Sequence, residues 1–488
     1  MRICLVSAEI APFAKMGGLG DVSAALGKYL AKNGHDVRLV MPFYDTIDAR
    51  ELNIRPVVRA RHILLKMGDK TYELDFFKTQ LPGANADVYL VGCPLLYERG
   101  AVYTTDGDEY LRFAVLTRAA IELCKRLNWA PDIFHANDWH TALLPIYIKT
   151  IYGYDKIFQK SKTVLTLHNI GYQGIFPAET VNDLSLSAFY FWFDSQDLYH
   201  GRINFLKNGI RHAHKITTVS PTYAREIQTE TYGAGLEKLL RQRANDLLGI
   251  LNGVDYQEWN PETDVFIPFH YSIKNLSGKK KNKEALLKKA GLATRWLQQP
   301  MVSMISRLVE QKGIDLLMGA MEGLLRRFEF SLVVLGSGAI RYEQFFFSLQ
   351  ERFPERVKFF RGYDYALSHL IEAGADIFLM PSLYEPCGLN QIYSLKYGTV
   401  PVVRKTGGLA DTVTLYDWQK QTGDGFVFEH YNTESFTWAV EYALTTFEHK
   451  TAWRKIMING MKKDFSWEKQ IKEYEKLYEN LMQANDED

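Results

Sequence analysis

The chain begins with the apolar run Ile3-Cys4-Leu5-Val6-Ser7, and the glycine-rich run Lys15-Met16-Gly17-Gly18-Leu19-Gly20-Asp21 follows it. The first run predicts a buried β-strand, and apolar residues at helical spacing continue the second run into a helix. Paired glycines at a helix N-terminus let backbone amides approach a phosphate or a sugar, and Lys15 adds a positive charge. A strand, a glycine turn and a helix in this order predict an α/β fold.

The same alternation of short strands and helix-period segments continues along the chain. In the first half the predicted strands are Ile3–Ser7, Val37–Met41, Asp132–His135, Val164–His168 and Lys215–Val219. In the second half they are Met301–Ser306, Ser331–Gly336, Val357–Phe360, Asp376–Met380 and Val400–Val403. Because these strands are apolar on both faces, they predict two Rossmann-like, doubly wound domains whose ligands gather at the carboxyl ends of the strands.

A length of 488 residues exceeds one ordinary core, so we expect two large domains. A polar, proline-containing stretch from Asp255 to about Pro300 separates the two strand-rich halves. We therefore place the first domain at residues 1–255 and the second at residues 256–465. Residues 466–488 are predicted to form a helix with one apolar face, which packs back on the first domain.

The composition is that of a soluble globular protein, with 47% hydrophobic and 24% charged residues. A formal net charge of +1 offers no field that would attract a nucleic acid, so an uncharged polymer is a better-matched partner. No apolar run is long enough to span a bilayer, which predicts no membrane partner. The four cysteines are too scattered for a disulfide framework, and we expect a cytoplasmic protein without a signal peptide.

Two cations, Arg307 and Lys312, follow the predicted strand Met301–Ser306. They stand just beyond the carboxyl end of that strand and beside a helix that begins near Gly313, where they could neutralise a diphosphate. A surface salt bridge is the alternative explanation. The position at a strand end favours a functional role.

The most specific stretch is Pro381-Ser382-Leu383-Tyr384-Glu385-Pro386-Cys387-Gly388-Leu389, directly after the predicted strand Asp376–Met380. Pro386 keeps Glu385 out of a helix, so we expect its carboxylate in a loop close to the free backbone amides of Gly388 and Leu389. A carboxylate beside amides suits sugar hydroxyls, although a capped loop without a ligand is the alternative. A second Gly-Gly-Leu turn is Thr406-Gly407-Gly408-Leu409-Ala410-Asp411. Either of the two turns, taken alone, is explained equally well as a structural turn.

Polar groups and an aromatic residue also follow two strands of the first half, in the runs Asp138-Trp139-His140 and His168-Asn169. This combination fits a carbohydrate cleft. An Asp and a His two residues apart also suggest a metal, but no third ligand recurs at a zinc-like spacing. His135 and His214 are interpreted as hydrogen-bonded packing residues.

A series of motifs, taken in order, resembles the family of bacterial glycogen synthases and plastid starch synthases. The motifs are Lys15–Leu19, Asp138–His140, His168–Asn169, Asn252–Asp255, Arg307 with Lys312, Glu385–Leu389 and Thr406–Leu409. The resemblance extends from Met1 to about Trp467. It implies a GT-B architecture of two domains facing across a cleft, and transfer of glucose from ADP-glucose to an α-1,4-glucan with retention of configuration. It also implies that no metal and no cofactor takes part.

The resemblance further implies a role for each matched residue. The catalytic set would be Glu385 on the glucose hydroxyls, Arg307 and Lys312 on the pyrophosphate, and His168. The donor phosphate or sugar would contact Lys15, Gly17 and Gly18. The distal phosphate would be bound by Thr406, Gly407 and Gly408. The adenine ring would stack on Tyr363. The glucosyl and acceptor side of the site would be lined by Asp138, His168 and Asn252. The remaining binding residues would be Asp21, Asn169, Cys387, Gly388 and Leu389.

The sequence departs from the pattern of related enzymes at two positions. Many retaining transferases carry a second glutamate eight residues after the first, but here that position is Tyr393. A mechanism with paired carboxylates in this loop is therefore in doubt. Asn390 stands where the family commonly has threonine, and we expect little consequence because both side chains are polar.

Four other activities remain open from the sequence. The donor could be UDP-glucose, since adenine and uracil stack similarly on Tyr363. The acceptor could be a small sugar, as in sucrose or trehalose-phosphate synthases. The protein could also bind glucan without catalysis, or be a nicotinamide-dependent oxidoreductase on the same scaffold. The absence of a G-x-G-x-x-G run argues against the oxidoreductase.

Overall fold

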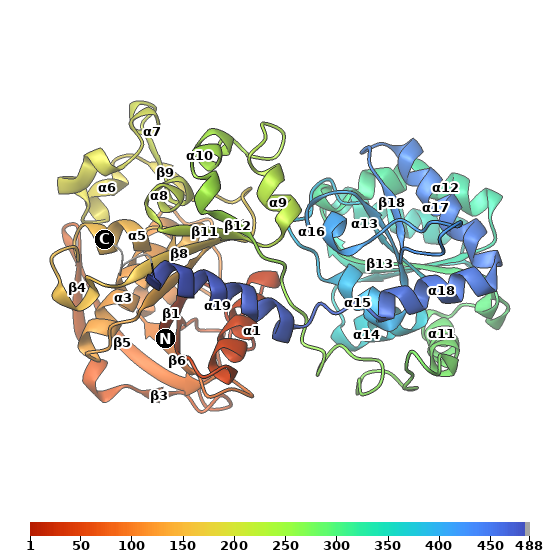
Figure 1. Ribbon diagram of the computed structural model, residues 1–488, viewed down its shortest axis with the longest axis horizontal. Coiled ribbons are helices and arrows are strands. Elements are labelled where there is room, and N and C mark those ends of the chain that lie inside the picture. Colours follow the sequence, from red (N-terminus) through yellow and green to blue (C-terminus); the bar gives the residue numbers. More distant parts are fainter. Residues whose placement is uncertain (484–488) are drawn as a thin grey trace. The chain divides into compact units, whose positions relative to one another are not determined.

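The computed structural model describes residues 1–483, and the chain divides into two compact units (Figure 1). The first unit contains Met1–Val219, Ala224–Gly253 and the chain from Trp467 onward. The second contains Ser220–Tyr223 and Val254–Ser466. Residues 484–488 of the predicted terminal helix lie outside the described residues.

The first unit is built on a sheet that has ten strands within the described residues. In spatial order they are β12 (Leu247–Gly249), β11 (Lys215–Thr218), β8 (Lys162–Leu167), β7 (Ile133–Asn137), β1 (Arg2–Val6), β2 (Asp36–Pro42), β6 (Asp87–Gly92), β5 (Lys70–Gln80) and β3 (Arg55–Pro56), with β4 (Ile63–Met67) paired to β5. The run from β12 to β6 is parallel, and every strand predicted in the first half belongs to it.

The strands β3, β4 and β5 add an antiparallel edge that was not predicted. Their sequences lack a continuous apolar run, because β4 and the first part of β5 alternate between buried and exposed residues. Such alternation is typical of an antiparallel strand with one face toward solvent. The prediction of a parallel sheet is therefore confirmed for the strands from β12 to β6, and the strands β3, β4 and β5 are the exception.

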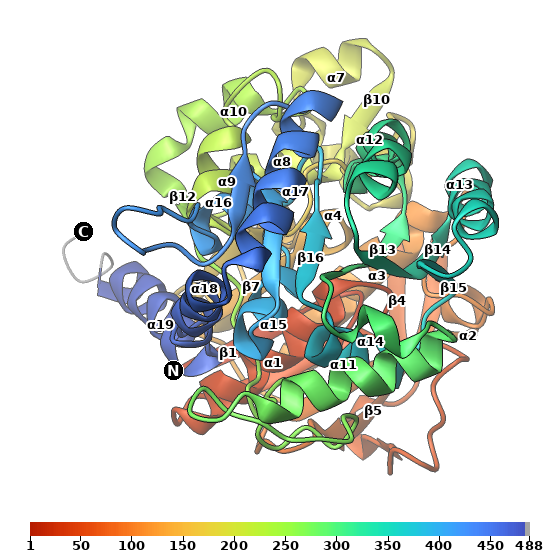
Figure 2. The ribbon, with the colours of Figure 1, turned by 90° about the vertical axis from the view of Figure 1, so that its right-hand side faces the viewer.

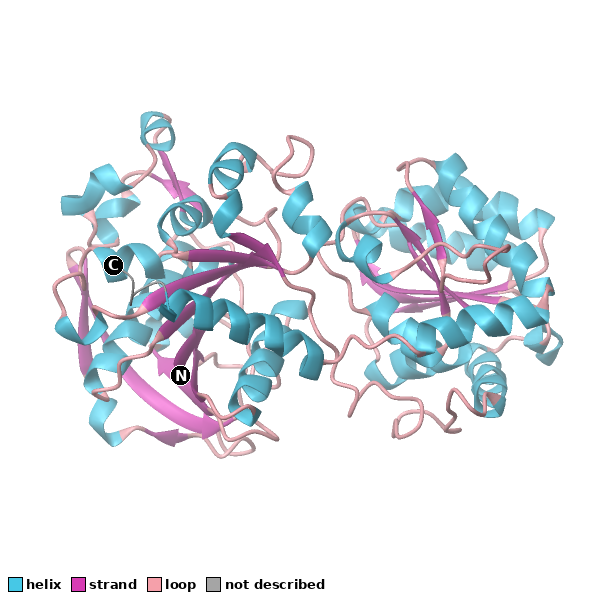
Figure 3. Ribbon diagram, viewed as in Figure 1, coloured by secondary structure: helices cyan, strands magenta, loops and turns pink. Residues whose placement is uncertain are grey.

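Helices lie on both faces of the first sheet (Figure 3). The α-helices within residues 1–253 are α1 (Gly18–Lys32), α2 (Pro94–Tyr97), α3 (Glu109–Arg126), α4 (Asp138–Thr141), α5 (Leu144–Lys149), α6 (Thr180–Asp183), α7 (Ser195–Tyr199), α8 (Phe205–His212), α9 (Pro221–Glu226) and α10 (Glu237–Gln242). Four 3₁₀ turns, η1 (Val58–Ala60), η2 (Lys156–Phe158), η3 (Ser187–Trp192) and η4 (Ala244–Asp246), and a small ribbon of β9 (Ile175–Pro177) with β10 (Arg202–Asn204) complete this part.

The second unit is a wholly parallel sheet of six described strands. Their order is β15 (Val357–Arg361), β14 (Ser331–Gly338), β13 (Met301–Leu308), β16 (Ile377–Met380), β17 (Val400–Arg404) and β18 (Phe426–Phe428). The helices are α11 (Ser277–Ala290), α12 (Ile314–Arg327), α13 (Ile340–Arg352), α14 (Tyr365–Gly374), α15 (Asn390–Tyr397), α16 (Gly407–Thr412), α17 (Thr433–Glu448) and α18 (Lys450–Met461), with the turns η5 (Thr294–Leu297) and η6 (Glu310–Lys312). Every strand predicted in the second half is present.

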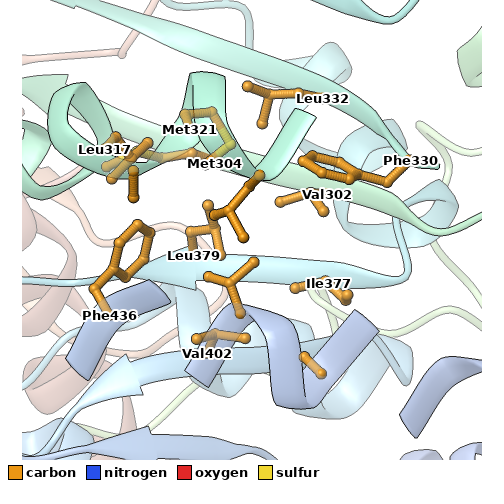
Figure 4. Close-up of a cluster of buried hydrophobic side chains, with 14 of the residues drawn as sticks. Val302, Met304, Leu317, Met321, Phe330, Leu332, Ile377, Leu379, Val402 and Phe436 are labelled. Carbon is orange, nitrogen blue, oxygen red and sulfur yellow. The ribbon is translucent and has the colours of Figure 1, made fainter. Parts of the chain in front are cut away.

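Residues of β13 alternate between two hydrophobic clusters on opposite faces of the second sheet. Val302 and Met304 belong to the cluster covered by α12 and α17, which Figure 4 shows with Phe436 of α17 closing over the strands. Met301 belongs to the other cluster, formed with α11 and α14, and Figure 2 shows these two helices away from α12 and α17. A strand that is apolar on both faces needs helices on both sides, so the prediction of a doubly wound sheet is confirmed.

The terminal helix α19 (Trp467–Gln483) packs in the first unit against α1. The predicted apolar residues of this helix are buried: Ile471, Tyr474, Leu477, Tyr478 and Leu481. The Tyr478 hydroxyl lies 2.6 Å from His135 Nδ1, and the other ring nitrogen of His135 lies 2.6 Å from Thr166 Oγ1. Burial lowers the pKa of His135 to about 3, so the ring is neutral at pH 7. The interpretation of His135 as a hydrogen-bonded packing residue is confirmed.

Two further properties of the described residues bear on the sequence predictions. All four cysteines are buried and free, as the scattered spacing predicted. Within residues 1–483, no helix combines the length and the apolar character needed to cross a membrane.

Replacing Tyr478 with Phe should lower the free energy of unfolding by about 1–3 kcal/mol, because a buried nitrogen of His135 loses its partner. Urea denaturation of the whole protein measures this change. Tyr199→Phe is the matched control, since that ring is 87% exposed, and it should leave the stability unchanged. Equal stability of the Tyr478→Phe variant and the parent would contradict the role of this contact in holding α19.

Candidate active site

The loop between β1 and α1 is held by a buried carboxylate that the sequence did not single out. Glu9 is 3% exposed, and its Oε2 accepts hydrogen bonds from the backbone amides of Met16 at 2.6 Å and Gly17 at 3.2 Å. Its Oε1 accepts a hydrogen bond from the Tyr103 hydroxyl. The amide of Gly17 is therefore engaged inside the loop, and Glu9 fixes the backbone that precedes α1.

The two glycines of this loop leave open space beside the backbone. A Cβ atom added to Gly17 or to Gly18 would meet no other atom within 4 Å. Gly17 has an extended conformation, with φ −162°, which other residues also adopt. Neither packing nor backbone geometry explains the glycines, whereas room for a ligand does. Lys15, two residues before Gly17, pairs with Asp21 at 2.8 Å.

The polar residues that follow β7 and β8 lie at the same sheet edge, because these parallel strands are neighbours. Asp138 Oδ1 accepts a hydrogen bond of 2.7 Å from the backbone amide of His168 and a weaker one of 3.5 Å from that of Asn169. Burial raises the pKa of the Asp138 carboxyl to about 7. Enclosure of the His168 ring lowers its pKa to about 3, and its Nε2 lies 2.9 Å from Asn137 Oδ1. His168 is therefore neutral at pH 7 and supplies no positive charge.

Asn252 follows β12 at the same edge of the first sheet. Its side chain is buried, and its Oδ1 accepts no hydrogen bond within the described residues. A buried polar atom without a partner calls for a water or a ligand, because burial without a hydrogen bond costs about 1–3 kcal/mol.

A pocket of about 680 Å³ opens beside these strand ends in the first unit. Its walls are Thr104, Thr105, Asp106, Glu109, Trp139, Gly171, Tyr172, Gln173, Gly174, Ile175, Phe176 and Ala234. Of these residues, only Trp139 belongs to a run that the sequence predicted for a carbohydrate cleft. The run Tyr172-Gln173 comes two residues after His168-Asn169 and combines an aromatic ring with an amide, which was the available signal for the rest of the wall. Aromatic faces beside amide and carboxylate groups suit a sugar.

The carboxyl ends of β13 and β16 bring Lys312 and Glu385 together in the second unit. Lys312 Nζ lies 2.6 Å from Glu385 Oε2, and the Ser382 hydroxyl donates to the same oxygen at 2.9 Å. Glu385 is 5% exposed, so its carboxylate is buried and held rather than displayed. Within the described residues its Oε1 has no hydrogen-bond partner and remains able to accept one.

Arg307 is the penultimate residue of β13 and is exposed, and its side chain makes no hydrogen bond or ion pair within residues 1–483. The amides of Gly388 and Leu389, which precede α15, likewise donate to no group in the described part of the chain. Tyr363 follows β15 at the same sheet edge and is 70% exposed. The structure thus gathers cations, amides and an accessible aromatic ring at the strand ends of the second unit.

The second Gly-Gly-Leu turn packs against the Glu385 loop. A Cβ on Gly407 would lie 1.9 Å from the Glu385 carbonyl oxygen, and one on Gly408 would lie 2.1 Å from that of Cys387. The Gly408 amide donates to the Glu385 carbonyl at 3.1 Å. These glycines and Thr406, the residue before α16, therefore support the loop that carries Glu385 and Cys387. Their predicted contact with a phosphate stays a prediction.

Metal ligands do not gather at these strand ends. Within the described part of the chain, no group of three or more His, Cys, Asp or Glu residues is placed to hold a metal ion.

Comparison with known proteins gives matches along almost the whole chain. Residues 2–242 match the starch synthase catalytic domain family, and residues 294–459 match the glycosyl transferases group 1 family. The glycogen synthase of Thermosipho melanesiensis is 43% identical over 484 residues, covering 99% of each chain. That of Kosmotoga olearia is 44% identical over 485 residues, covering 99% of this chain and 98% of its own. The chain belongs to the glycogen and starch synthase family.

Solved structures confirm the GT-B architecture. The catalytic domain of starch synthase IV from Arabidopsis thaliana, bound to ADP and acarbose, is 34% identical, with a TM-score of 0.91 and 99% coverage of each chain. Sucrose-phosphate synthase from Thermosynechococcus elongatus is 16% identical with a TM-score of 0.63, also with 99% coverage of each chain, and it shows the fold alone. The protein is therefore a hexosyltransferase of the glycogen and starch synthase class.

Glu9→Gln should lower kcat/KM for the nucleotide-sugar donor about ten- to a hundredfold, because the loop amides lose charge-assisted hydrogen bonds. Steady-state kinetics with the donor as the varied substrate measures this. Glu98→Gln, at an exposed carboxylate of the same unit, is the control and should retain the activity of the parent. A Glu9→Gln enzyme with parental kinetics would show that the loop does not depend on Glu9.

Asp138→Asn should stabilise the protein increasingly as the pH rises. Folding raises the pKa of Asp138 from 3.8 to about 7, so the folded protein holds this proton more tightly than the unfolded chain does. The resulting contribution to the free energy of unfolding is complete below pH 3.8 and is lost as the pH rises to 7. Asparagine does not ionise, so the difference in free energy of unfolding should grow by on the order of 2–4 kcal/mol across that range. Urea denaturation at both ends of the range tests this, and a constant difference would contradict it.

Proposed function

We propose that the protein transfers glucose from ADP-glucose to the non-reducing end of an α-1,4-glucan with retention of configuration. Family membership supports the glucan product, and the bound ADP in the Arabidopsis starch synthase IV structure supports an adenine nucleotide. The observation that carries the proposal is the Lys312–Glu385 pair, with Arg307 at the adjacent end of β13. This arrangement supports the proposal because it combines fixed positive charge with one available carboxylate oxygen, as binding of a sugar diphosphate requires.

In this mechanism the bond between glucose C1 and the diphosphate oxygen breaks, and its electron pair goes to the leaving ADP. Arg307 and Lys312 stabilise the negative charge that develops on the diphosphate, which is the largest contribution expected of a preorganised site. Glu385 Oε1 accepts a hydrogen bond from a glucose hydroxyl and orients the ring. The mechanism needs no metal and no cofactor, because these side chains supply the charge.

The 4-hydroxyl of the acceptor forms the new bond to C1 on the face that the diphosphate leaves, and its proton passes to a phosphate oxygen. We assign the acceptor to the pocket lined by Trp139, Tyr172 and Phe176, near Asp138 and His168. Asp138 is largely protonated below pH 7 and His168 is neutral, and the two carboxylates of the pocket wall, Asp106 and Glu109, are paired with Arg99 and Arg112. This balance of charge suits an uncharged sugar. The four free cysteines fit the cytoplasm, where we place the reaction.

A donor panel tests the proposal. The whole protein is incubated with ADP-glucose or UDP-glucose and glycogen, and release of nucleoside diphosphate is measured together with labelled glucose in the glucan. We expect release and incorporation with ADP-glucose to exceed those with UDP-glucose. Preference for UDP-glucose, or release only with a small sugar phosphate as acceptor, would overturn the proposed donor or acceptor. Glucan binding without any release would overturn the proposed catalysis.

Arg307→Ala and Lys312→Ala should each lower kcat about a hundredfold, and the double variant should lose less than the product of both effects. The reason is that both side chains act on one developing charge. Lys280→Ala, an exposed lysine on α11 of the same unit, is the control and should retain the parental kcat. If each variant raised only the KM for the donor, the two cations would bind the ground state without assisting departure of the diphosphate.

A further inference from the structure

The polar stretch that precedes α11 places one buried tryptophan, Trp259, between two helices of the second unit. Its indole ring stacks on His369 of α14, with ring centroids 3.8 Å apart and planes 13° apart, and on Tyr393 of α15, at 3.8 Å and 5°. Two nearly parallel rings at this distance would overlap on one face of the indole, so His369 and Tyr393 lie on opposite faces. Trp259 is therefore inserted between α14 and α15, which are neighbours in the fold (Figure 1).

A buried carboxylate holds both helices in this arrangement. Asp264 Oδ2 lies 2.8 Å from His369 Nδ1 and accepts a hydrogen bond of 2.5 Å from the hydroxyl of Tyr397, the last residue of α15. Burial opposes the charge of Asp264, but the hydrogen bonds with His369 and Tyr397 outweigh it and hold the pKa of the carboxyl below its usual value. The side chains of Asp264 and His369 are fully buried. Polar groups buried so deeply and joined in this way specify a single geometry for the elements that carry them.

Helix α15 begins directly after the loop that carries Glu385. The amide of Tyr393 donates to the carbonyl of Leu389 at 3.0 Å, so these two residues bound the first turn of the helix. The amides of Gly388 and Leu389, which donate to no group within residues 1–483, stand at the start of this turn. The ring that stacks on Trp259 therefore belongs to the same turn as the amides of the proposed donor site.

We propose that Trp259 is a positioning residue for the donor site, because it fixes the first turn of α15 through Tyr393. That turn presents the amides of Gly388 and Leu389 and follows the loop of Glu385. This inference rests on the proposed function, since it concerns the donor of that reaction. The indole is 8% exposed, so it acts on the donor through α15 and not by contact. Small displacements matter here, because a misplacement of about 1 Å costs about a hundredfold in rate.

A purely structural role of Trp259 leads to a different expectation. A buried indole also stabilises its unit by packing, so its loss would lower the melting temperature in either case. With a structural role alone, each folded molecule would keep the parental kcat. With a positioning role, folded molecules lose kcat and affinity for the diphosphate. The KM for glycogen should stay unchanged, because the proposed acceptor pocket belongs to the first unit.

The test compares Trp259→Ala with the parent, as whole proteins and well below the melting temperature of each. We expect kcat with ADP-glucose and glycogen to fall about ten- to a hundredfold, and the KM for glycogen to stay within about twofold. The Kd for ADP, measured by isothermal titration calorimetry, should rise about tenfold. Trp259→Phe keeps a flat ring between the two helices and should recover kcat to within about threefold of the parent.

Trp296→Ala is the matched control. That indole is 3% exposed and belongs to the hydrophobic cluster formed with α11 and α14. Its loss should lower the melting temperature and leave kcat and the Kd for ADP at parental values.

A second variant removes the stack from the side of α15. Tyr393→Leu leaves Trp259 in place and should lower kcat about as much as Trp259→Ala does. Because each substitution breaks the same stack, the double variant should lose no more than about the larger single loss. If circular dichroism shows that Trp259→Ala does not fold, Tyr393→Leu carries the same prediction, and parental kcat and ADP binding in it overturn the proposal.

Three further results would overturn the proposal. The first is parental kcat and ADP binding in folded Trp259→Ala. The second is an equal loss in Trp296→Ala, which would assign the effect to general destabilisation of the unit. The third is losses that multiply in the double variant, since these would show independent contributions. If the parent transferred glucose to no acceptor, the proposed function would fail, while the Kd for ADP would still decide whether Trp259 positions the site.

Discussion

Parallel strands that are buried on both faces determine where this protein can place polar chemistry. Each such strand needs a helix on either side, so helices cover both faces of the sheet. Val302 and Met301 illustrate this, since neighbouring residues of β13 enter different hydrophobic clusters. The carboxyl ends of the strands are then the places where loops and helix N-termini meet without being covered by the core. Asp138 and His168 directly follow β7 and β8, Arg307 is the penultimate residue of β13, and Glu385 lies in the loop after β16.

Charged groups at these strand ends are buried only where the structure satisfies them. Glu9 accepts two backbone amides and a tyrosine hydroxyl, and Glu385 accepts a lysine and a serine hydroxyl through one oxygen. Asp138 accepts two backbone amides, and burial raises its pKa to about 7. The three carboxyls therefore differ in what they can do. Glu9 shapes a loop, Glu385 keeps one oxygen for a ligand, and burial favours the protonated form of Asp138.

The sequence predicted the parallel strands because they are continuous apolar runs, and it predicted Lys312 and Glu385 because they follow those runs. It did not predict the contact between the two, since the pairing of β13 with β16 brings together residues that are far apart along the chain. Glu9 was missed for a similar reason, because its role depends on the path of the loop that returns over it. The antiparallel strands β3 to β5 lacked the apolar signal, and the pocket wall lies in a loop without periodicity.

The two Gly-Gly-Leu turns have the same sequence pattern but different surroundings in the structure. Both follow a parallel strand and precede a helix, so the sequence treats them alike. At Gly407 and Gly408 a side chain would collide with the carbonyls of Glu385 and Cys387, which makes these glycines a structural requirement of the loop beside them. At Gly17 and Gly18 a side chain would meet nothing within the first unit. A glycine that the fold does not need is better explained by what binds beside it, so the first turn is the stronger candidate for direct contact with the donor.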